Sequence, residues 1–259
     1  METIAIIQQK GGTGKSTTAA AIGAGLILKG YKVLLVDLDA QGNLTFITGA
    51  KARGKTIVDL LQQAADPEAE QTLTTQAAIQ HTPQGDILPS APALAGADTV
   101  LADVPGKEFL LKGILQPVKG IYDYCIIDTP PTLGTLTVNA LAAAERAIAP
   151  AQADIFSLAA LSQLNTTIAT VKKYCNPGLE LSGIVITRYN GRPIISRETA
   201  ERIGQAAEQY GTRLYDTRIR ECTAIKEAAT MRQSIFDYAP RSNAAKDYTA
   251  LINEILEEE

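Results

Sequence analysis

The sequence predicts an α/β fold, with a doubly wound, mostly parallel sheet that carries helices on both faces. The first observation is a set of short apolar runs, such as residues 4–7 and 124–127, that are continuous rather than alternating. Such runs are typical of strands buried on both faces. The second is that segments with helical periodicity separate the runs, because strand–helix alternation builds parallel sheets through right-handed crossovers. A ligand site is then expected at the carboxyl ends of the strands.

The expected elements alternate along the chain. Strands are expected at residues 4–7, 32–37, 124–128, 146–150 and 181–187. Helices are expected at residues 16–29, 155–175, 196–209 and 243–257. Gly30 follows the first helix at a position that favours glycine, and residues 81–87 predict a hairpin turn. No linker or repeat interrupts the pattern, so residues 1–259 are expected to form a single domain.

Composition excludes several classes of protein. Apolar residues make up 46% of the chain and charged residues 20%, which is ordinary for a globular protein and excludes low-complexity disorder. No run approaches the 18 or so apolar residues of a membrane span, and the first residues do not resemble a signal peptide. Cys125, Cys175 and Cys222 are unclustered, which argues against a disulfide framework and favours a reducing cytoplasm. A single histidine, His81, excludes catalysis by several histidines.

Charge is distributed unevenly along the sequence. The formal net charge is −4, yet residues 186–241 carry 10 Lys and Arg against 7 Asp and Glu. Nine of the eleven arginines lie in that block. The overall charge does not indicate nucleic-acid binding, but a local basic patch remains compatible with it.

The sharpest motif is the glycine-rich segment at residues 9–17, which follows an expected strand and opens an expected helix. Glycines let backbone N–H groups surround a phosphate, and the helix N-terminus adds partial positive charge. Lys15 can reach the β- and γ-phosphates, and the Ser16 hydroxyl can bind Mg²⁺. A plain strand–helix turn with solvated lysines is the alternative, which the flanking elements disfavour. The candidate ATP-binding residues are Gly11, Gly12, Thr13, Gly14, Lys15, Ser16 and Thr17.

Three aspartates follow apolar runs at expected strand ends. Asp37 and Asp39 come after the second run, and Asp128 ends the third before Thr-Pro-Pro. A carboxylate after four apolar residues is the Walker B pattern, which places it beside Mg²⁺. Taken singly, each aspartate could equally cap a turn or a helix. Together with the phosphate loop they favour a magnesium site, for which Ser16, Asp37 and Asp128 are the candidate ligands.

The loop resembles the deviant Walker A motif, K-G-G-x-G-K-[ST], with Lys10 at its start. This motif marks the P-loop NTPase family that includes the ParA/Soj partition ATPases, MinD and the nitrogenase iron protein. Residues 37–43 resemble the D-L-D-P-Q-G-N box of ParA/Soj, with Ala40 in place of proline. The resemblance implies that Lys10 reaches the phosphates of a partner across an ATP dimer. It also implies that Asp39 orients the attacking water, so the expected catalytic residues are Lys10, Lys15 and Asp39.

The same resemblance implies further contacts in the late part of the chain. The adenine pocket is expected at Asn190 and at a turn spanning 216–220, with Thr217 and Arg218 as contacts. The family's DNA-contacting basic residues fall in these segments, which selects Arg192, Arg218 and Arg220. The alternative for each arginine is a solvated side chain paired with a nearby glutamate. Since nothing precedes the first strand, no N-terminal helix-turn-helix domain is expected.

The sequence features separate the members of this family. The cysteines lack the paired motif of the iron protein, and residues 244–255 carry an apolar stripe whose polar side is acidic, which disfavours a membrane anchor. We therefore expect a cytoplasmic, nucleoid-associated partition ATPase with ATP and Mg²⁺ as cofactors. Its expected partners are a second copy of the chain, nonspecific double-stranded DNA and a ParB-like protein, and no membrane. A MinD-like membrane-cycling ATPase and a P-loop small-molecule ligase are the alternatives.

Overall fold

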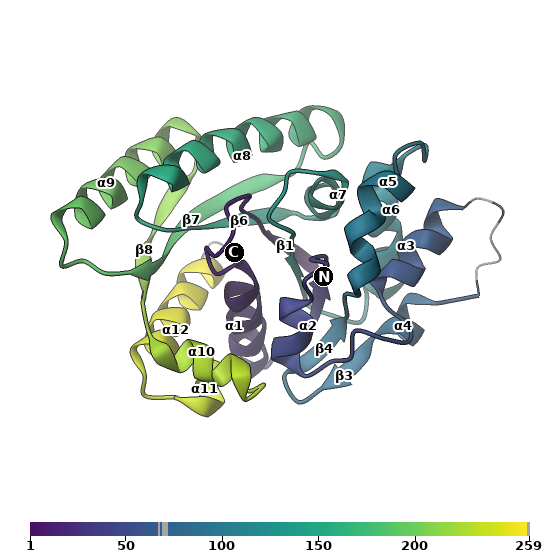
Figure 1. Ribbon diagram of the computed structural model, residues 1–259, viewed down its shortest axis with the longest axis horizontal. Coiled ribbons are helices and arrows are strands. Elements are labelled where there is room, and N and C mark those ends of the chain that lie inside the picture. Colours follow the sequence, from purple (N-terminus) through teal and green to yellow (C-terminus); the bar gives the residue numbers. More distant parts are fainter. Residues whose placement is uncertain (67, 69–71, 258–259) are drawn as a thin grey trace.

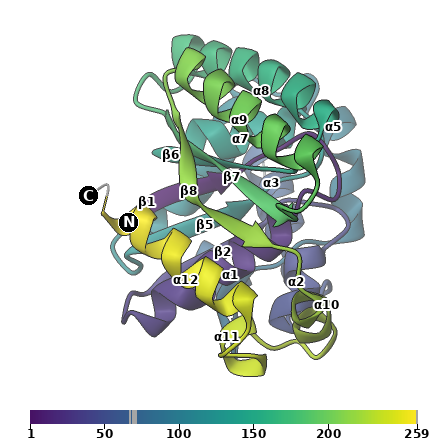
Figure 2. The same ribbon diagram turned by 90° about the vertical axis from the view of Figure 1, so that its left-hand side faces the viewer.

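The computed structural model describes residues 1–66, 68 and 72–257. One twisted sheet runs through these residues, with helices on both of its faces (Figure 1, Figure 2). The strand order is β3-β4-β2-β5-β1-β6-β7-β8, and only the β3–β4 pair is antiparallel. The strands are β1 (Glu2–Ile6), β2 (Val33–Asp37), β3 (Gln80–Thr82), β4 (Gly85–Leu88), β5 (Tyr124–Asp128), β6 (Arg146–Ala151), β7 (Glu180–Tyr189) and β8 (Arg213–Arg220). The predicted doubly wound, mostly parallel fold is confirmed.

The helices divide into two layers, each with its own apolar core. One core joins the sheet to α1 (Lys15–Leu28), α2 (Asn43–Thr48), α10 (Thr223–Thr230), α11 (Ile235–Tyr238) and α12 (Asn243–Leu256). The other joins it to α3 (Ile57–Ala65), α4 (Thr75–Ala78), α5 (Ala97–Val100), α6 (Leu110–Leu115), α7 (Thr135–Ala143), α8 (Ile155–Tyr174) and α9 (Ile194–Gln209). In the described part of the chain, no helix is long and apolar enough to cross a bilayer.

Helix α12 lies against α1, and the two helices pack closely. A Cβ at Gly25 would come within 2.1 Å of the Ile252 side chain, so only glycine permits this approach. Tyr248, Leu251 and Ile255 are buried in the same contact. The apolar stripe of the C-terminal helix therefore covers the protein's own core. The last two glutamates of the chain, whose charge entered the sequence argument, lie outside the described residues.

Most expected elements form close to their expected bounds, and one prediction is wrong. Residues 81–87 form the expected hairpin between β3 and β4. Residues 216–220, expected as a turn, instead belong to β8, which pairs in parallel with β7. The physical reason is the spacing of apolar residues, since Tyr215 and Ile219 are both buried while the residues between them are polar. That pattern lacks the continuous apolar run by which the other strands were recognised.

Candidate functional site

The phosphate loop lies between β1 and α1, where the sequence placed it. Gly12 and Gly14 have φ angles of 77° and 86°, which side-chain-bearing residues rarely adopt. The hydroxyl of Thr187 on β7 donates to the Thr13 carbonyl oxygen at 2.7 Å, and the Gln152 side chain donates to the Gly12 carbonyl oxygen at 2.9 Å. The neighbouring strands β6 and β7 thus fix the loop with its backbone curved above the N-terminus of α1.

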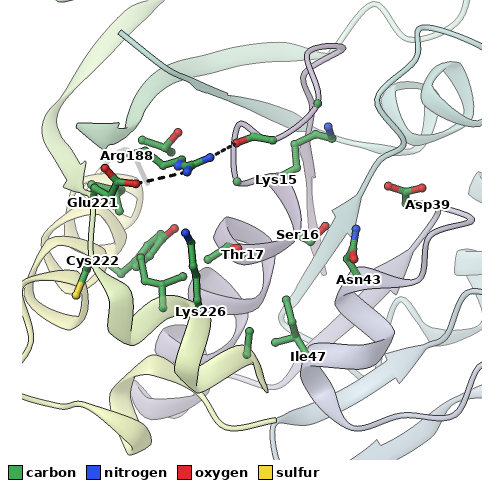
Figure 3. Close-up of a pocket in the computed structure, with 18 of the residues that line it drawn as sticks. Lys15, Ser16, Thr17, Asp39, Asn43, Ile47, Arg188, Glu221, Cys222 and Lys226 are labelled. Atoms are coloured by element: carbon green, nitrogen blue, oxygen red, sulfur yellow. Dashed lines mark hydrogen bonds and ion pairs between the residues drawn. The ribbon is translucent and has the colours of Figure 1, made fainter. Parts of the chain in front are cut away.

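A cavity of about 460 Å³ opens beside this loop, at the carboxyl ends of the strands (Figure 3). One side consists of the loop with α1 and the segment after β2, and the other consists of the end of β8 with α10 and α12. Of the predicted ATP-binding residues, the loop side contributes Gly11, Gly12, Gly14, Lys15, Ser16 and Thr17. Thr13 belongs to the same loop but is buried and is not part of that lining.

Lys15 and two aspartates form a buried charged group under the loop. Lys15 is only 7% exposed, and this burial lowers its pKa although the charges of Asp128 and Asp39 oppose the shift. Burial, followed by the charge of Asp37, raises the pKa of Asp128 well above its usual range. The Ser16 side chain opposes this shift as a hydrogen-bond partner and Lys15 opposes it by its charge, but no further hydrogen-bond partner of the Asp128 carboxylate lies among the described residues. A buried carboxylate with so few partners, next to a hydroxyl, fits a hydrated Mg²⁺, which prefers one or two carboxylates beside substrate phosphates.

Asp37 lies near Asp128 and also accepts hydrogen bonds from the segment that follows it. Its carboxylate accepts hydrogen bonds from the Thr45 backbone and hydroxyl, both at 2.7 Å, and from the Asp39 backbone at 3.1 Å. Burial raises the pKa of Asp37 to about 6, although these hydrogen bonds oppose the shift. Asp37 thereby fixes α2 and the 37–43 segment. Its predicted role as a magnesium ligand stays a prediction.

Asp39 reaches the cavity on the loop side (Figure 3). Its carboxylate caps the next turn by accepting the Gln41 N–H at 3.0 Å. The Ser90 hydroxyl donates to the Asp39 carbonyl oxygen, and the Ser90 N–H donates to the Thr45 hydroxyl at 2.9 Å. These contacts hold Asp39 at the cavity with Gln41 and Asn43, which also line it.

Lys10 behaves differently from Lys15, although both belong to the same loop. Its ammonium contacts the Asp154 carboxylate just before α8 and lies 3.3 Å from the Gln152 side-chain oxygen. Burial alone would raise the pKa of Asp154, but hydrogen bonds from Lys10 and Ser157 hold that pKa below its usual value. Among the described residues that line the cavity, Lys10 is absent. Its side chain is therefore directed away from the nucleotide-sized space of its own chain.

The far end of the cavity differs from the expected adenine pocket. It is lined by Arg188, by residues 219–222, and by Ile225, Lys226 and Tyr248. Within the described chain, Asn190, Thr217 and Arg218 are not part of that lining. The Asn190 side chain accepts the Arg192 N–H, the Thr217 N–H donates to Glu254 at 2.9 Å, and Arg218 packs over the Tyr189 ring. The expected turn placed Thr217 and Arg218 at the pocket, whereas the strand carries them away from it.

The three predicted DNA-contacting arginines lie in different environments. Arg220 makes a multiple hydrogen-bonded ion pair with Asp247, which is only 8% exposed. Arg218 donates to the Tyr189 hydroxyl at 2.8 Å. Arg192 is exposed in the segment before α9. Arg220 thus has a structural role that the sequence did not reveal, and the DNA contacts themselves stay predictions.

Comparisons with known proteins show which family the chain belongs to. Residues 1–181 match a family model described as an AAA domain. The chain is 35% identical to the chromosome-partitioning ATPase Soj of Treponema pallidum, over 98% of this chain and 97% of that protein. It is 32% identical to the chromosome partitioning protein ParA of Caulobacter vibrioides, over 100% and 95% of the two chains. The chain belongs to the ParA/Soj family of partition ATPases.

A solved structure of a similar protein allows the two folds to be compared as well. It is described as cobyrinic acid a,c-diamide synthase from Mycobacterium smegmatis with bound ATP analog and magnesium. The two chains are 32% identical, with a TM-score of 0.84 over 99% of this chain and 94% of that one. That structure holds an ATP analog together with magnesium, and the loop and Asp128 of the present chain fit the same two cofactors by their chemistry.

Sequence reasoning missed Arg188, Glu221, Lys226 and Tyr248 as cavity residues. The sequence placed Tyr248 in an apolar helical stripe. It placed Arg188 and Lys226 in a basic patch, with Glu221 as one of the carboxylates that could pair with that patch. The single available signal was the position of Arg188 directly after Thr187 at a strand end, because strand ends form ligand sites in such sheets.

Proposed function

We propose that this protein is an ATP-dependent dimerising switch for DNA partition. In this proposal the ATP dimer binds DNA without sequence preference, and a ParB-like partner stimulates hydrolysis and release. Membership of the partition ATPase family supports the general role. The steps of dimerisation, DNA binding and stimulation are the part that needs testing.

The observation that carries the proposal is the different placement of the two lysines of the loop, Lys10 and Lys15. Lys15 is buried at the cavity beside Asp39 and Asp128, where it can hold the β- and γ-phosphates of its own nucleotide. Lys10 lies outside that lining, in an ion pair whose two side chains are 23% and 34% exposed. A cation in that position is available to the nucleotide of a second copy, as an arginine finger is when supplied in trans.

The chemistry of the site is positioning and electrostatic stabilisation. Ser16 and Asp128 would hold Mg²⁺. A bound Mg²⁺ would neutralise the charge that develops on the phosphates. Asp39, held by the contacts of Gln41 and Ser90, would orient the attacking water. No strong base lies among these residues, so intrinsic turnover is expected to be slow. Slow turnover suits a switch whose release awaits a partner.

A second candidate function has one observation in its favour. The similar Mycobacterium smegmatis protein is named as a diamide synthase, and amide formation with ATP would need a carboxylic acid substrate and an ammonia source. Glutamine-dependent ammonia transfer would use a nucleophilic cysteine with a histidine. His81 lies on β3, at one edge of the sheet, and its ring contacts Asp86. Cys222 lines the cavity and follows β8, at the opposite edge, so this cysteine and this histidine are far apart in the sheet. ATP hydrolysis that depends on added cobyrinic acid would favour this candidate.

The test is binding of the Asp39→Ala variant to a random-sequence duplex at low salt, with ATP or with ADP. The substitution removes the predicted water-orienting carboxylate, so ATP should persist and the dimer should accumulate. We expect binding with ATP only, weakened by about 10-fold or more between about 50 and 200 mM salt because phosphate contacts release counterions.

The matched control is the double variant Asp39→Ala/Lys10→Ala, which should bind ATP but neither dimerise nor bind DNA. Equal DNA binding with ATP and ADP would contradict the switch. Dimerisation with ATP but no DNA binding would contradict the DNA step, and pelleting with liposomes in that case would favour a membrane-cycling ATPase.

A further inference from the structure

Arg188 has the most unusual placement of any charged residue around the cavity. It directly follows Thr187, whose hydroxyl is bonded to the phosphate loop. Its φ angle is 51°, in the left-handed region that residues with side chains rarely adopt. Strained backbone of this kind persists where surrounding structure imposes it, and it is often found at ligand sites. The guanidinium lies between the phosphate loop and Glu221 (Figure 3).

The guanidinium of Arg188 bridges the two sides of the cavity. One of its nitrogens lies 3.5 Å from the Gly12 carbonyl oxygen, and another lies 3.4 Å from a carboxylate oxygen of Glu221 (Figure 3). Gly12 belongs to the phosphate loop, while Glu221 immediately follows β8 and precedes α10. Both residues line the cavity. A nucleotide held by the loop would therefore extend beneath this bridge.

The present partners of Arg188 hold it weakly. Both contacts are at the long limit of hydrogen bonding, and the side chains of Arg188 and Glu221 are 47% and 57% exposed. Exposed ion pairs of this kind contribute little. A phosphate offers the guanidinium shorter, charge-assisted hydrogen bonds with matched geometry. Exchange of these partners for a phosphate oxygen is therefore favourable.

We propose that Arg188 is a phosphate-binding residue of the nucleotide site, and that Glu221 competes with the phosphate for its guanidinium. This inference rests on the proposed nucleotide function, because it assigns a ligand to Arg188 within the same cavity. It adds a cation from β7 to the loop lysines. It also makes Glu221 a residue that weakens nucleotide binding. If the ion pair were purely structural, both Arg188 and Glu221 would instead stabilise the nucleotide site.

The experiment measures ADP and adenosine affinity by calorimetry for the wild-type chain and for three variants. Arg188→Ala should weaken ADP binding by about 10-fold or more, the value of a charge-assisted hydrogen bond, and leave adenosine binding unchanged. Arg188→Lys should recover part of the loss, since lysine keeps the charge without the planar fork. Glu221→Gln should strengthen ADP binding by up to about 5-fold because it removes the competitor. Thermal unfolding of each variant verifies that it is folded.

The proposal predicts changes of opposite sign in ADP affinity for Arg188→Ala and Glu221→Gln. Unchanged ADP affinity in Arg188→Ala overturns the inference, as does an equal loss in Arg188→Ala and Glu221→Gln, which would show a structural pair. Either result leaves the proposed function intact if the wild-type chain still binds ADP. A wild-type chain that binds neither ADP nor ATP would contradict the proposed function and this inference with it.

Discussion

The two sides of the nucleotide-sized cavity are built in different ways. The loop side comes from two short segments that are each contiguous in sequence, residues 11–17 and 37–43, with Asp128 close to Lys15. Its charges are buried, and their pKa values are shifted accordingly. The opposite side gathers single residues from β7, β8, α10 and α12. Its Arg188–Glu221 contact is long and exposed, whereas Arg220 is held by a multiply hydrogen-bonded pair with the buried Asp247. The buried groups of the loop side can stabilise charge strongly, whereas the exposed Arg188–Glu221 pair can change partners at little cost.

We therefore expect the two sides of the cavity to have different roles. Buried groups of fixed geometry suit the phosphates and magnesium, where catalysis depends on preorganised charge. Exposed groups with weak partners, such as Arg188 and Glu221, suit a response to the arrival of the nucleotide. Substitutions on the loop side should therefore abolish function, and those on the opposite side should tune it.

The largest effect is expected for Lys15→Ala on the loop side. The variant loses the cation at the β- and γ-phosphates, so ADP and ATP affinity should fall by about 100-fold or more. Calorimetry measures the affinity, and Lys10→Ala is the matched control because it removes the same charge from the same loop. Lys10→Ala should keep ADP affinity within about 3-fold. Comparable loss in both variants would contradict the division of labour between these lysines.

An intermediate effect is expected on dimerisation. Lys10→Ala should abolish the ATP-driven dimer, while Asp154→Asn should lower the protein concentration at which it forms by up to about 5-fold, because the ion pair no longer holds Lys10. Asparagine keeps an oxygen for the Ser157 N–H, so the cap of α8 survives. Light scattering with ATP measures the dimer. A weaker dimer in Asp154→Asn would show that Asp154 instead supports the dimer.

The smallest expected effect is one on stability, for Arg220→Ala. Its removal leaves the buried carboxylate of Asp247 without its guanidinium, so the thermal midpoint should fall by on the order of a few degrees. Arg192→Ala, an exposed arginine, should leave the midpoint unchanged and reduce DNA affinity instead. Equal midpoints for both variants would show that the Arg220–Asp247 pair contributes nothing to stability.

Prediction from sequence was most successful where local motifs carry the chemistry. The phosphate loop follows from its glycines and their place between a strand and a helix, because backbone N–H groups need that context to bind phosphate. Residues 216–220 illustrate the opposite case. They lack a continuous apolar run, and their strand forms because β7 provides a neighbour with unpaired backbone groups. The adenine contacts inferred from a turn at that place stay predictions, although neither Thr217 nor Arg218 lines the cavity.

The α/β class, the phosphate loop and the aspartates at the strand ends follow from the amino-acid sequence alone. Each of these depends on residue types at short spacing, which fix local backbone geometry and charge. Three other features depend on how the elements pack: Lys10 contacts Asp154, Arg220 pairs with Asp247, and Arg188 bridges Gly12 and Glu221. The residues in these contacts are separated by 27 to 176 positions. Packing of distant elements selects such partners, and no local pattern in the chain records them.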